Sequence, residues 1–337
     1  MVQAGSTTMT VDSSSMGQSV EDEIAYGGQA VIEGVMMRSR DRVATAVRHP
    51  DGDVFLQVRQ ITRGRVSESV RNIPVLRGIF SLWDMLNLGM KSLAFSAEIA
   101  LGEDESVSPD SKENEGSLPG NDDSAFVWAS LVMGIGGGII LFFVLPLLIV
   151  QFIDPFVQSD ILSNLIEGIV RICVLVSYMI SIGRLSDVRR TFEYHGAEHK
   201  TVNALENGVP LTSSEVIKQS ITHPRCGTSF LLIIVLISIV VFCFLGRPDL
   251  PIRIASRIMF VPIIAGVAFE LIRFTAQNRA RPWAKVLMGP GMWLQTLTTY
   301  PPSYEQCEVA IIAMDAVLPD VDTKTPLVIE GVNIRAC

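Results

Sequence analysis

The chain of 337 residues carries 27 Lys and Arg against 35 Asp and Glu, a formal net charge of −8. With 48% hydrophobic residues and a mean hydropathy of +0.38, it is too apolar for an ordinary soluble enzyme. The acidic balance argues against nucleic acid as a partner. Five cysteines without paired spacing predict no disulfide framework.

Residues 1–23, rich in Ser, Thr, Met and Gln, have neither the basic start nor the apolar core of a signal peptide, so we expect a disordered tail. Residues 24–72 predict a small β-rich cytoplasmic domain, because "RVATAVRH" and "DVFLQVRQ" flank the turn signal "PDG". The segment 305–318 is expected to add a strand or a short helix to the same domain.

Apolar residues recur at helical intervals over 73–100, interrupted by charged side chains such as Arg77 and Lys91. This pattern predicts an amphipathic helix that lies at the bilayer surface or packs under the spans. Residues 101–124 are acidic and poor in apolar side chains, and they predict a solvated linker.

Residues 125–275 predict a membrane domain of about four transmembrane helices. The apolar stretches are 126–153, 165–183, 230–246 and 254–274. Glu167 and Arg171 lie in the second stretch, where they can pair across one helical turn, and Arg257 and Glu270 lie in the fourth. The alternative for the second and fourth stretches is a buried or half-inserted helix that does not cross the bilayer. The expected fold class is a mainly α-helical membrane protein with a small mixed α/β cytoplasmic domain built from the N- and C-terminal segments.

Basic residues mark one side of the predicted bilayer. The connection 184–229 carries six Lys and Arg, whereas 154–164 carries none and 247–253 carries two. By the positive-inside rule, the 184–229 connection, the segment 276–337 and both termini are predicted to be cytoplasmic. The chain is therefore expected to be a multi-pass protein of the cell (inner or plasma) membrane, with the lipid bilayer as its partner.

The stretch "YHGAEHK" (194–200) places His195 and His199 one helical turn apart, with Glu198 between them. In a helix the two imidazoles project about 6 Å apart from one face, which suits a single metal ion. The order His-x-x-Glu-His is that of inverted zincins, where the Glu is the general base. Three fixed letters also occur by chance, and the alternative is a solvated helix face.

A second stretch, "THPRCGTSF" (222–230), directly precedes the third predicted span and supplies His223 and Cys226 as further candidate ligands. The alternative is a helix entry shaped by Pro224 and Gly227 and capped by Thr228 or Ser229. That alternative does not account for His223 and Cys226.

Two acids are possible additional ligands. Glu33 either reaches the metal from the amino-terminal domain or pairs with an arginine such as Arg38. Glu270 lies at the predicted membrane margin, where an ionisable residue is a candidate for function; the alternative is a pair with Arg273.

Five stretches, in order, resemble the YqhQ-like family, bacterial membrane proteins described only as predicted metal-dependent enzymes. They are "GGQAVIEGVMMR" (27–38), "YHGAEHK", "HPRCGTSF" (223–230), "LQTLTT" (294–299) and "EVAI" (308–311). The resemblance runs from about residue 24 to 318. It implies a multi-span membrane protein with a suspected metal site at His195, Glu198, His199, His223 and Cys226, with Glu33 a weaker addition. "TYPPSYEQCEVA" departs from the family, in which acidic residues often follow the Thr-Thr pair, so this loop is not predicted as a site.

The leading functional hypothesis is a metal-dependent hydrolase at the cytoplasmic membrane face. A divalent metal, expected to be zinc, would be bound by His195 and His199 with His223 or Cys226, and Glu198 would activate water. The substrate would be a peptide or an amphiphile. The alternative is a non-enzymatic membrane scaffold or assembly factor, in which all four ligands close a structural site. A third class is thiol chemistry at Cys226.

Overall fold

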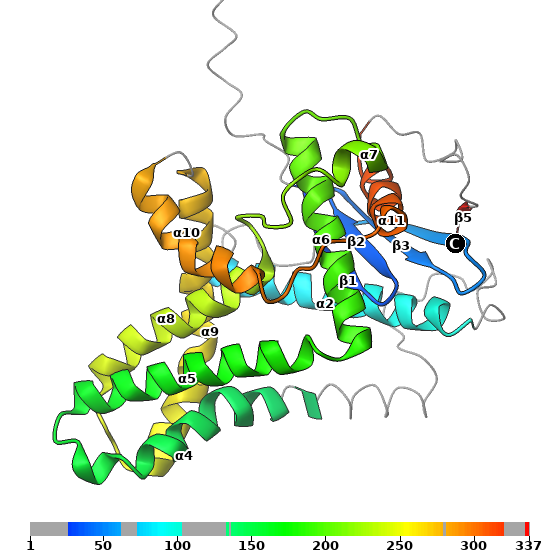
Figure 1. Cartoon of the computed structure of the whole chain (residues 1–337). Coiled ribbons are helices and arrows are strands. Elements are labelled where there is room, and N and C mark those ends of the chain that lie inside the picture. Colours follow the sequence, from blue (N-terminus) through cyan, green and yellow to red (C-terminus); the bar gives the residue numbers. More distant parts are fainter. Residues whose placement is uncertain are drawn as a thin grey trace, which may run out of the picture.

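The structure is a computed structural model that describes residues 26–61, 73–102, 133–134, 136–278, 281–319 and 334–336. The predictions for the tail at 1–23, for most of the linker at 101–124 and for the start of the first span lie outside the described residues. Figure 1 shows apolar helices gathered at one end of the molecule and a small sheet with its covering helices at the other.

The sheet is built from four antiparallel strands near the N-terminus. These are β1 (Gly27–Val31), β2 (Gly34–Arg38), β3 (Arg42–Arg48) and β4 (Val54–Gln60). The short β5 (Ile334–Ala336) pairs in parallel with β4, so the strand order follows the sequence. The "PDG" turn joins β3 to β4 with Arg48 opposite Val54, which confirms the predicted hairpin.

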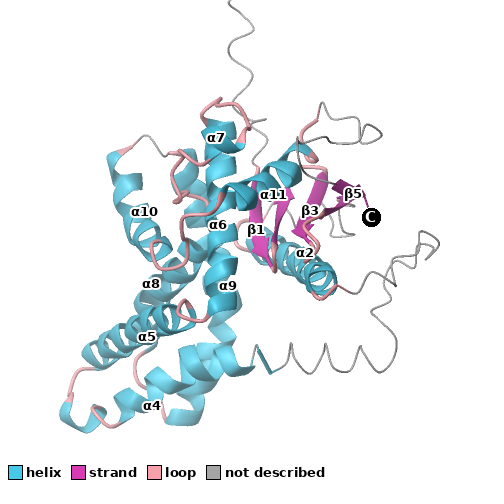
Figure 2. Ribbon diagram, turned by 45° about the vertical axis from the view of Figure 1, so that its right-hand side comes forward, coloured by secondary structure: helices cyan, strands magenta, loops and turns pink. Residues whose placement is uncertain are grey.

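Helices cover both faces of this sheet. On one face, Val35, Met37 and Ala44 pack against α6 (Ser186–Glu206) and α11 (Tyr304–Asp315). On the other face, side chains such as Met36 and Val43 pack against α2 (Leu76–Ala100), which Figure 2 shows under the strands. Successive strand residues point to opposite faces, so both sets are buried. Of the two alternatives for the segment 305–318, the helix is the one that forms.

Three described helices are long and apolar enough to cross a membrane: α5 (Asp160–Ile182), α8 (Gly227–Leu245) and α9 (Leu250–Gln277). The described part of the first predicted span is a shorter apolar helix over Gly136–Gln151. It comprises a π-helical segment, η3 (Ile140–Val144), and α4 (Leu145–Gln151), and the 3-10 turn η4 (Asp154–Phe156) follows it. The described residues thus contain three candidate spans, where the sequence predicts about four for the membrane domain.

The π-helical segment has a local cause. Pro146 has no N–H to donate to the carbonyl of Phe142, four residues before it. Arg171 of α5 donates from Nε to that carbonyl oxygen at 2.9 Å. A neighbouring helix therefore satisfies the backbone group that the proline leaves open, as expected for an irregular helix in an apolar bundle.

The charges inside the candidate spans face one another. Glu167 of α5 accepts hydrogen bonds from Arg171 at 2.7 Å and Arg253 at 2.8 Å, and Arg257 lies at 3.2 Å. All four side chains are at most 3% exposed. The predicted pairing of Glu167 with Arg171 is confirmed, and two arginines from α9 join it. We call these four residues the span network; it ties α5 to α9.

Two further helices complete the described chain. The four-residue α7 (Ser213–Val216) follows α6. Helix α10 (Pro282–Gln295) comes after α9 and packs at Gly291 against Ser229, in the first turn of α8. The segment after α10 then runs past α6 to α11, with the Tyr300 N–H donating to the Phe192 carbonyl at 3.0 Å. These contacts bring α6, α8 and the 296–302 segment together.

Candidate metal centre

Three of the predicted ligands meet where α6 passes the first residues of α8. His195 and His199 project from α6 with their ring centres 4.4 Å apart. Cys226 directly precedes α8, and its Sγ lies 3.2 Å from His195 Nε2. One ligand atom from each of His195, His199 and Cys226 lies within 4.8 Å of the others. We call these three residues the His/His/Cys cluster.

Backbone carbonyls orient both imidazoles. His195 Nδ1 lies 2.9 Å from the carbonyl oxygen of Thr298, and His199 Nδ1 lies 2.6 Å from that of Ile221. A carbonyl oxygen only accepts hydrogen bonds, so each Nδ1 carries the proton and each Nε2 keeps its lone pair. His199 Nε2 is buried and has no hydrogen-bond partner among the described residues. Two such lone pairs beside a sulfur fit zinc, which prefers nitrogen and sulfur ligands.

Cys226 is held by the start of α8. It is the N-cap residue of that helix, and its sulfur accepts the Thr228 N–H at 3.4 Å. The Thr228 hydroxyl also lies 3.1 Å from the sulfur. The cap by Thr228 or Ser229 in the alternative interpretation of this stretch is therefore wrong, because the cysteine that precedes them takes this position. The N-terminus of a helix favours a thiolate, the form of cysteine that binds metals.

Glu198 lies beside the cluster without joining it. Its Oε2 is 3.9 Å from His195 Nε2, and its Oε1 accepts the Gly28 N–H of β1 at 3.0 Å. A Cβ at position 28 would lie 2.9 Å from Glu198 Cγ, so the glycine permits this close approach. Burial raises the pKa of the Glu198 carboxyl, while the charges of His195 and His223 and the Gly28 hydrogen bond oppose that rise.

His223 lies next to the cluster, with its ring centre 6.0 Å from that of His199. The Gln295 side chain holds its backbone on both sides, accepting the His223 N–H at 2.9 Å and donating to the His223 carbonyl at 2.8 Å. His223 Nδ1 accepts the Arg225 N–H at 3.4 Å, and Nε2 lies 3.4 Å from Glu206 Oε1. His223 is thus close to the cluster but outside the group of converging ligand atoms.

The two additional acids are bound by arginines. Glu33 forms an ion pair with Arg190 and accepts from the Tyr194 hydroxyl at 3.3 Å. Glu270 accepts from Arg77 of α2 at two positions, 2.6 and 2.5 Å. Neither acid belongs to the cluster of converging ligand atoms. The arginines differ from Arg38 and Arg273, the partners that the sequence suggested.

Several residues that build the centre have no predicted role. Gln295 and Thr298 lie in "LQTLTT", and Gly28 lies in "GGQAVIEGVMMR", so the stretches that carry the family resemblance contain them. Their position in those stretches is the sequence signal that could have identified these three residues as part of the centre. The Ile221 carbonyl has no sequence signal, because any residue type supplies a backbone oxygen.

The molecule combines a small helix-covered sheet, apolar helices of membrane-spanning length and a His/His/Cys cluster between them. These features place the chain in the class of proteins that have candidate membrane spans and a candidate metal centre. It belongs to the family described as "Protein of unknown function (DUF1385)", whose model matches residues 73–320. It is 32% identical over 303 residues to "Uncharacterized protein YqhQ" of Bacillus subtilis (strain 168), with 87% of this chain and 92% of the relative covered. The expected YqhQ-like family is confirmed. No solved structure matches the chain.

Proposed function

We propose that this protein is a metal-dependent membrane hydrolase whose zinc ion would be held by His195, His199 and Cys226. The observation that carries the proposal is the convergence of these three ligand atoms within 4.8 Å, beside the buried carboxylate of Glu198. Three protein ligands leave one position of a tetrahedral zinc site open, which is the arrangement of catalytic sites. A structural zinc site has four protein ligands.

In this proposal Glu198 is the proton acceptor. Zinc, when bound, would supply a Lewis acid that lowers the pKa of a water molecule. The Gly28 N–H fixes Glu198 Oε1, which leaves Oε2 on the side of His195 to take the proton. Burial raises the pKa of the Glu198 carboxyl, and a raised pKa makes a carboxylate a stronger proton acceptor. The Thr298 and Ile221 carbonyls keep each imidazole in the tautomer that offers Nε2.

We place the site on the cytoplasmic face of the cell membrane, because the basic residues of 184–229 favour that side. Cys226 directly precedes α8, a helix of membrane-spanning length. A site at the end of such a helix suits a substrate that is itself at the membrane surface. The substrate class is therefore a membrane-associated peptide or another amphiphile.

Replacing Glu198 with Gln tests the proposal. The Gln side chain keeps the size of Glu and can still accept the Gly28 N–H, but it cannot take the proton. Glu198→Gln should retain zinc and lose about a hundredfold or more in turnover, the usual contribution of a positioned base. Turnover is measured with fluorogenic peptide and lipid-ester substrates. Glu215→Gln, in an exposed pair with Lys218, is the control and should keep full activity.

Other outcomes would change the assignment. Full turnover in Glu198→Gln would remove its role as the base. A loss of zinc as severe as in the histidine variants would make Glu198 a ligand.

The alternative function is a scaffold or assembly factor with a structural metal site. The 6.0 Å between the ring centres of His199 and His223 favours it, because His223 is near enough to close the site after a small shift. In that case Glu198→Gln should change neither zinc content nor any cellular phenotype. His223→Gln should then release zinc as readily as His199→Ala and lower stability in proportion.

A further inference from the structure

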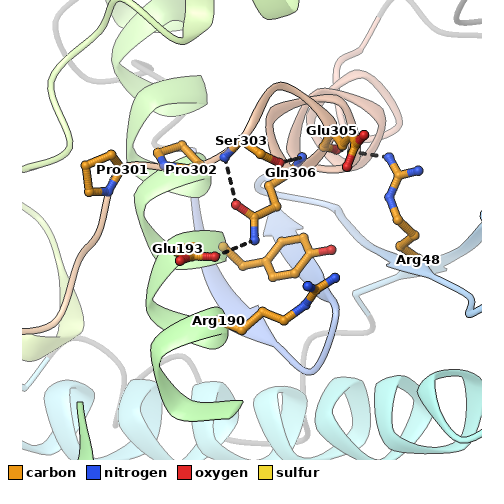
Figure 3. A pocket seen from close by; sticks show the side chains of 9 residues that line it. Arg48, Arg190, Glu193, Pro301, Pro302, Ser303, Glu305 and Gln306 are labelled. Atoms are coloured by element: carbon orange, nitrogen blue, oxygen red, sulfur yellow. Dashed lines mark hydrogen bonds between the residues drawn. The ribbon is translucent and has the colours of Figure 1, made fainter. Parts of the chain in front are cut away.

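A cavity of about 430 Å³ between α6 and the first turn of α11 is lined by polar groups that bind one another. Figure 3 shows the Gln306 side chain donating to Glu193 at 3.0 Å and Arg48 donating to the Glu305 carbonyl at 3.0 Å. A further lining arginine, Arg190, is ion-paired. These polar groups have partners within the chain, in contrast to the apolar residues on the surface of α10.

Helix α10 exposes one apolar face. Its exposed large hydrophobic residues are Trp283, Val286, Leu287 and Trp293. Intervals of three, four and seven residues keep side chains on the same side of a helix, so these four residues form a single face, which we call the α10 face. Val286 at its centre is 75% exposed. A different side of the helix is buried, where Gly291 packs against Ser229 of α8.

The α10 face continues the exposed apolar side of α9. The Phe274 ring of α9 stacks on the Trp283 indole, with ring centres 5.3 Å apart and an interplanar angle of 26°. Phe274 is itself exposed, and so are Ile263 and Val267 on the same side of α9. Because α9 is a candidate membrane span, a bilayer that covers its exposed side also reaches the α10 face.

The charges around the α10 face are all of one sign. Residues 273–300 contain no Asp or Glu, and their basic residues are Arg273, Arg279, Arg281 and Lys285. Arg281 and Lys285 are exposed, and neither forms an ion pair within the described part of the chain. Basic side chains beside an apolar helical face favour the surface of a bilayer that contains anionic lipids, and tryptophan is enriched at that interface.

Two other arrangements of α10 fit these observations less well. Its 14 residues extend over about 21 Å, too short for the roughly 30 Å hydrocarbon core of a bilayer. A two-fold contact between two copies through the α10 face would bring like charges together, because the same basic residues would face each other. We propose that α10 is a surface-bound helix. Its apolar face inserts into one leaflet, and Arg281 and Lys285 bind anionic lipid headgroups.

This membrane contact is connected to the candidate metal centre. Helix α10 ends at Gln295, whose side chain holds the backbone of His223 on both sides and donates to Ser229 Oγ at 2.7 Å. A surface-bound α10 therefore fixes the segment next to the His/His/Cys cluster at the level of the lipid headgroups. Lipid binding by α10 depends neither on a metal nor on hydrolysis.

Quenching of tryptophan fluorescence by brominated lipids tests the proposal. The full chain with Trp83→Phe and Trp128→Phe keeps Trp283 and Trp293 as its only tryptophans. It is reconstituted into vesicles of phosphatidylcholine and phosphatidylglycerol. Lipid brominated near the headgroup end of its acyl chains should quench the emission more than lipid brominated near the chain ends. At equal mole fraction, brominated phosphatidylglycerol should quench more than brominated phosphatidylcholine. If this variant does not fold, the difference between the unaltered chain and Trp293→Phe reports the emission of Trp293.

Lys285→Gln should lower the preference for the anionic lipid about fivefold, the contribution expected of one basic residue near an anionic surface. Lys218→Gln is the matched control, because it removes the same charge from a lysine outside α10 that is 63% exposed at its side chain. Its preference should equal that of the unaltered chain. The proposal is overturned if bromine at neither depth quenches, if chain-end bromine quenches more strongly, if both lipid classes quench equally, or if Lys285→Gln behaves as Lys218→Gln does. Zinc content of the same samples reports separately on the proposed function.

Discussion

The span network and the His/His/Cys cluster are both buried and polar, yet their atoms face one another differently. In the span network, guanidinium donors from Arg171, Arg253 and Arg257 surround one acceptor, Glu167. In the cluster, two Nε2 lone pairs and a sulfur face one another. One thiol proton can serve one Nε2, and His199 Nε2 then has no partner among the described residues.

The difference teaches that burial of polar groups does not by itself mark a functional site. In the span network opposite charges face one another, so it needs no cation and acts as structure, although Arg253 Nε and Arg257 Nη1 have no hydrogen-bond partner among the described residues. A set of electron pairs that point at one another gains most from a cation. The same criterion assigns Glu33 and Glu270 to structure, because each faces an arginine.

The largest expected effect comes from breaking the span network. Glu167→Gln removes the carboxylate that three buried guanidiniums share, and Arg253 keeps a second one, Asp154 at 2.8 Å. Removing one partner of a buried ion pair costs about 3–5 kcal/mol of the free energy of unfolding. Glu215→Gln makes the same change in the exposed pair with Lys218 and should cost less than about 1 kcal/mol. Denaturant unfolding in detergent measures both. Equal losses in the two variants would show that the network is not a stabilising element.

An intermediate effect is expected where β1 supports the cluster. Gly28→Ala places a Cβ against the Met36 carbonyl oxygen of β2 and 2.9 Å from Glu198 Cγ, and such overpacking costs about 1–3 kcal/mol. It should also weaken zinc binding, because Glu198 and the adjacent His195 must shift. At Gly27 a Cβ would meet no atom within 4 Å, so Gly27→Ala should stay within about 0.5 kcal/mol. Thermal unfolding and zinc titration check both variants. If Gly28→Ala matches Gly27→Ala, the close packing of β1 on Glu198 is refuted.

The smallest expected effect is a pH dependence of the metal-free protein. Burial lowers the pKa of His199 below the ordinary value of 6.5. On acidification the unfolded chain therefore binds more protons than the folded chain. The contribution of His199 to the free energy of unfolding is complete above about pH 6.5 and is lost as the pH falls through the lowered pKa of the folded state. Burial raises the pKa of Glu198 above 4.5, and its contribution has the opposite sign, lost as the pH rises through the folded pKa.

Glu198→Gln separates the two groups. In this background the melting temperature of the chelated protein should fall on acidification below about pH 6.5, and adding His199→Asn should flatten that fall. An unchanged slope after His199→Asn would assign the acid sensitivity to other groups.

The sequence predicts elements whose signals are local. The "PDG" hairpin, the helical histidine pair and the Glu167–Arg171 pair each depend on residues a few positions apart. The partners that complete the centre are distant: the Thr298 carbonyl meets His195 across 103 positions, and Gly28 meets Glu198 across 170. Periodicity contains no information on such contacts. For the same reason Glu33 and Glu270 pair with Arg190 and Arg77, while the sequence suggested nearer arginines.

Elemental analysis of the purified full chain tests the central claim most directly. The unaltered protein should hold about one zinc ion per chain, as should His49→Ala, whose histidine pairs with Asp51 in the β3–β4 turn. His195→Ala, His199→Ala and Cys226→Ala should each lose most of the metal, because each removes one of three converging ligands. Full zinc occupancy in a His195/His199 double variant, or zinc-free unaltered protein after purification in zinc-containing buffer, would contradict the account.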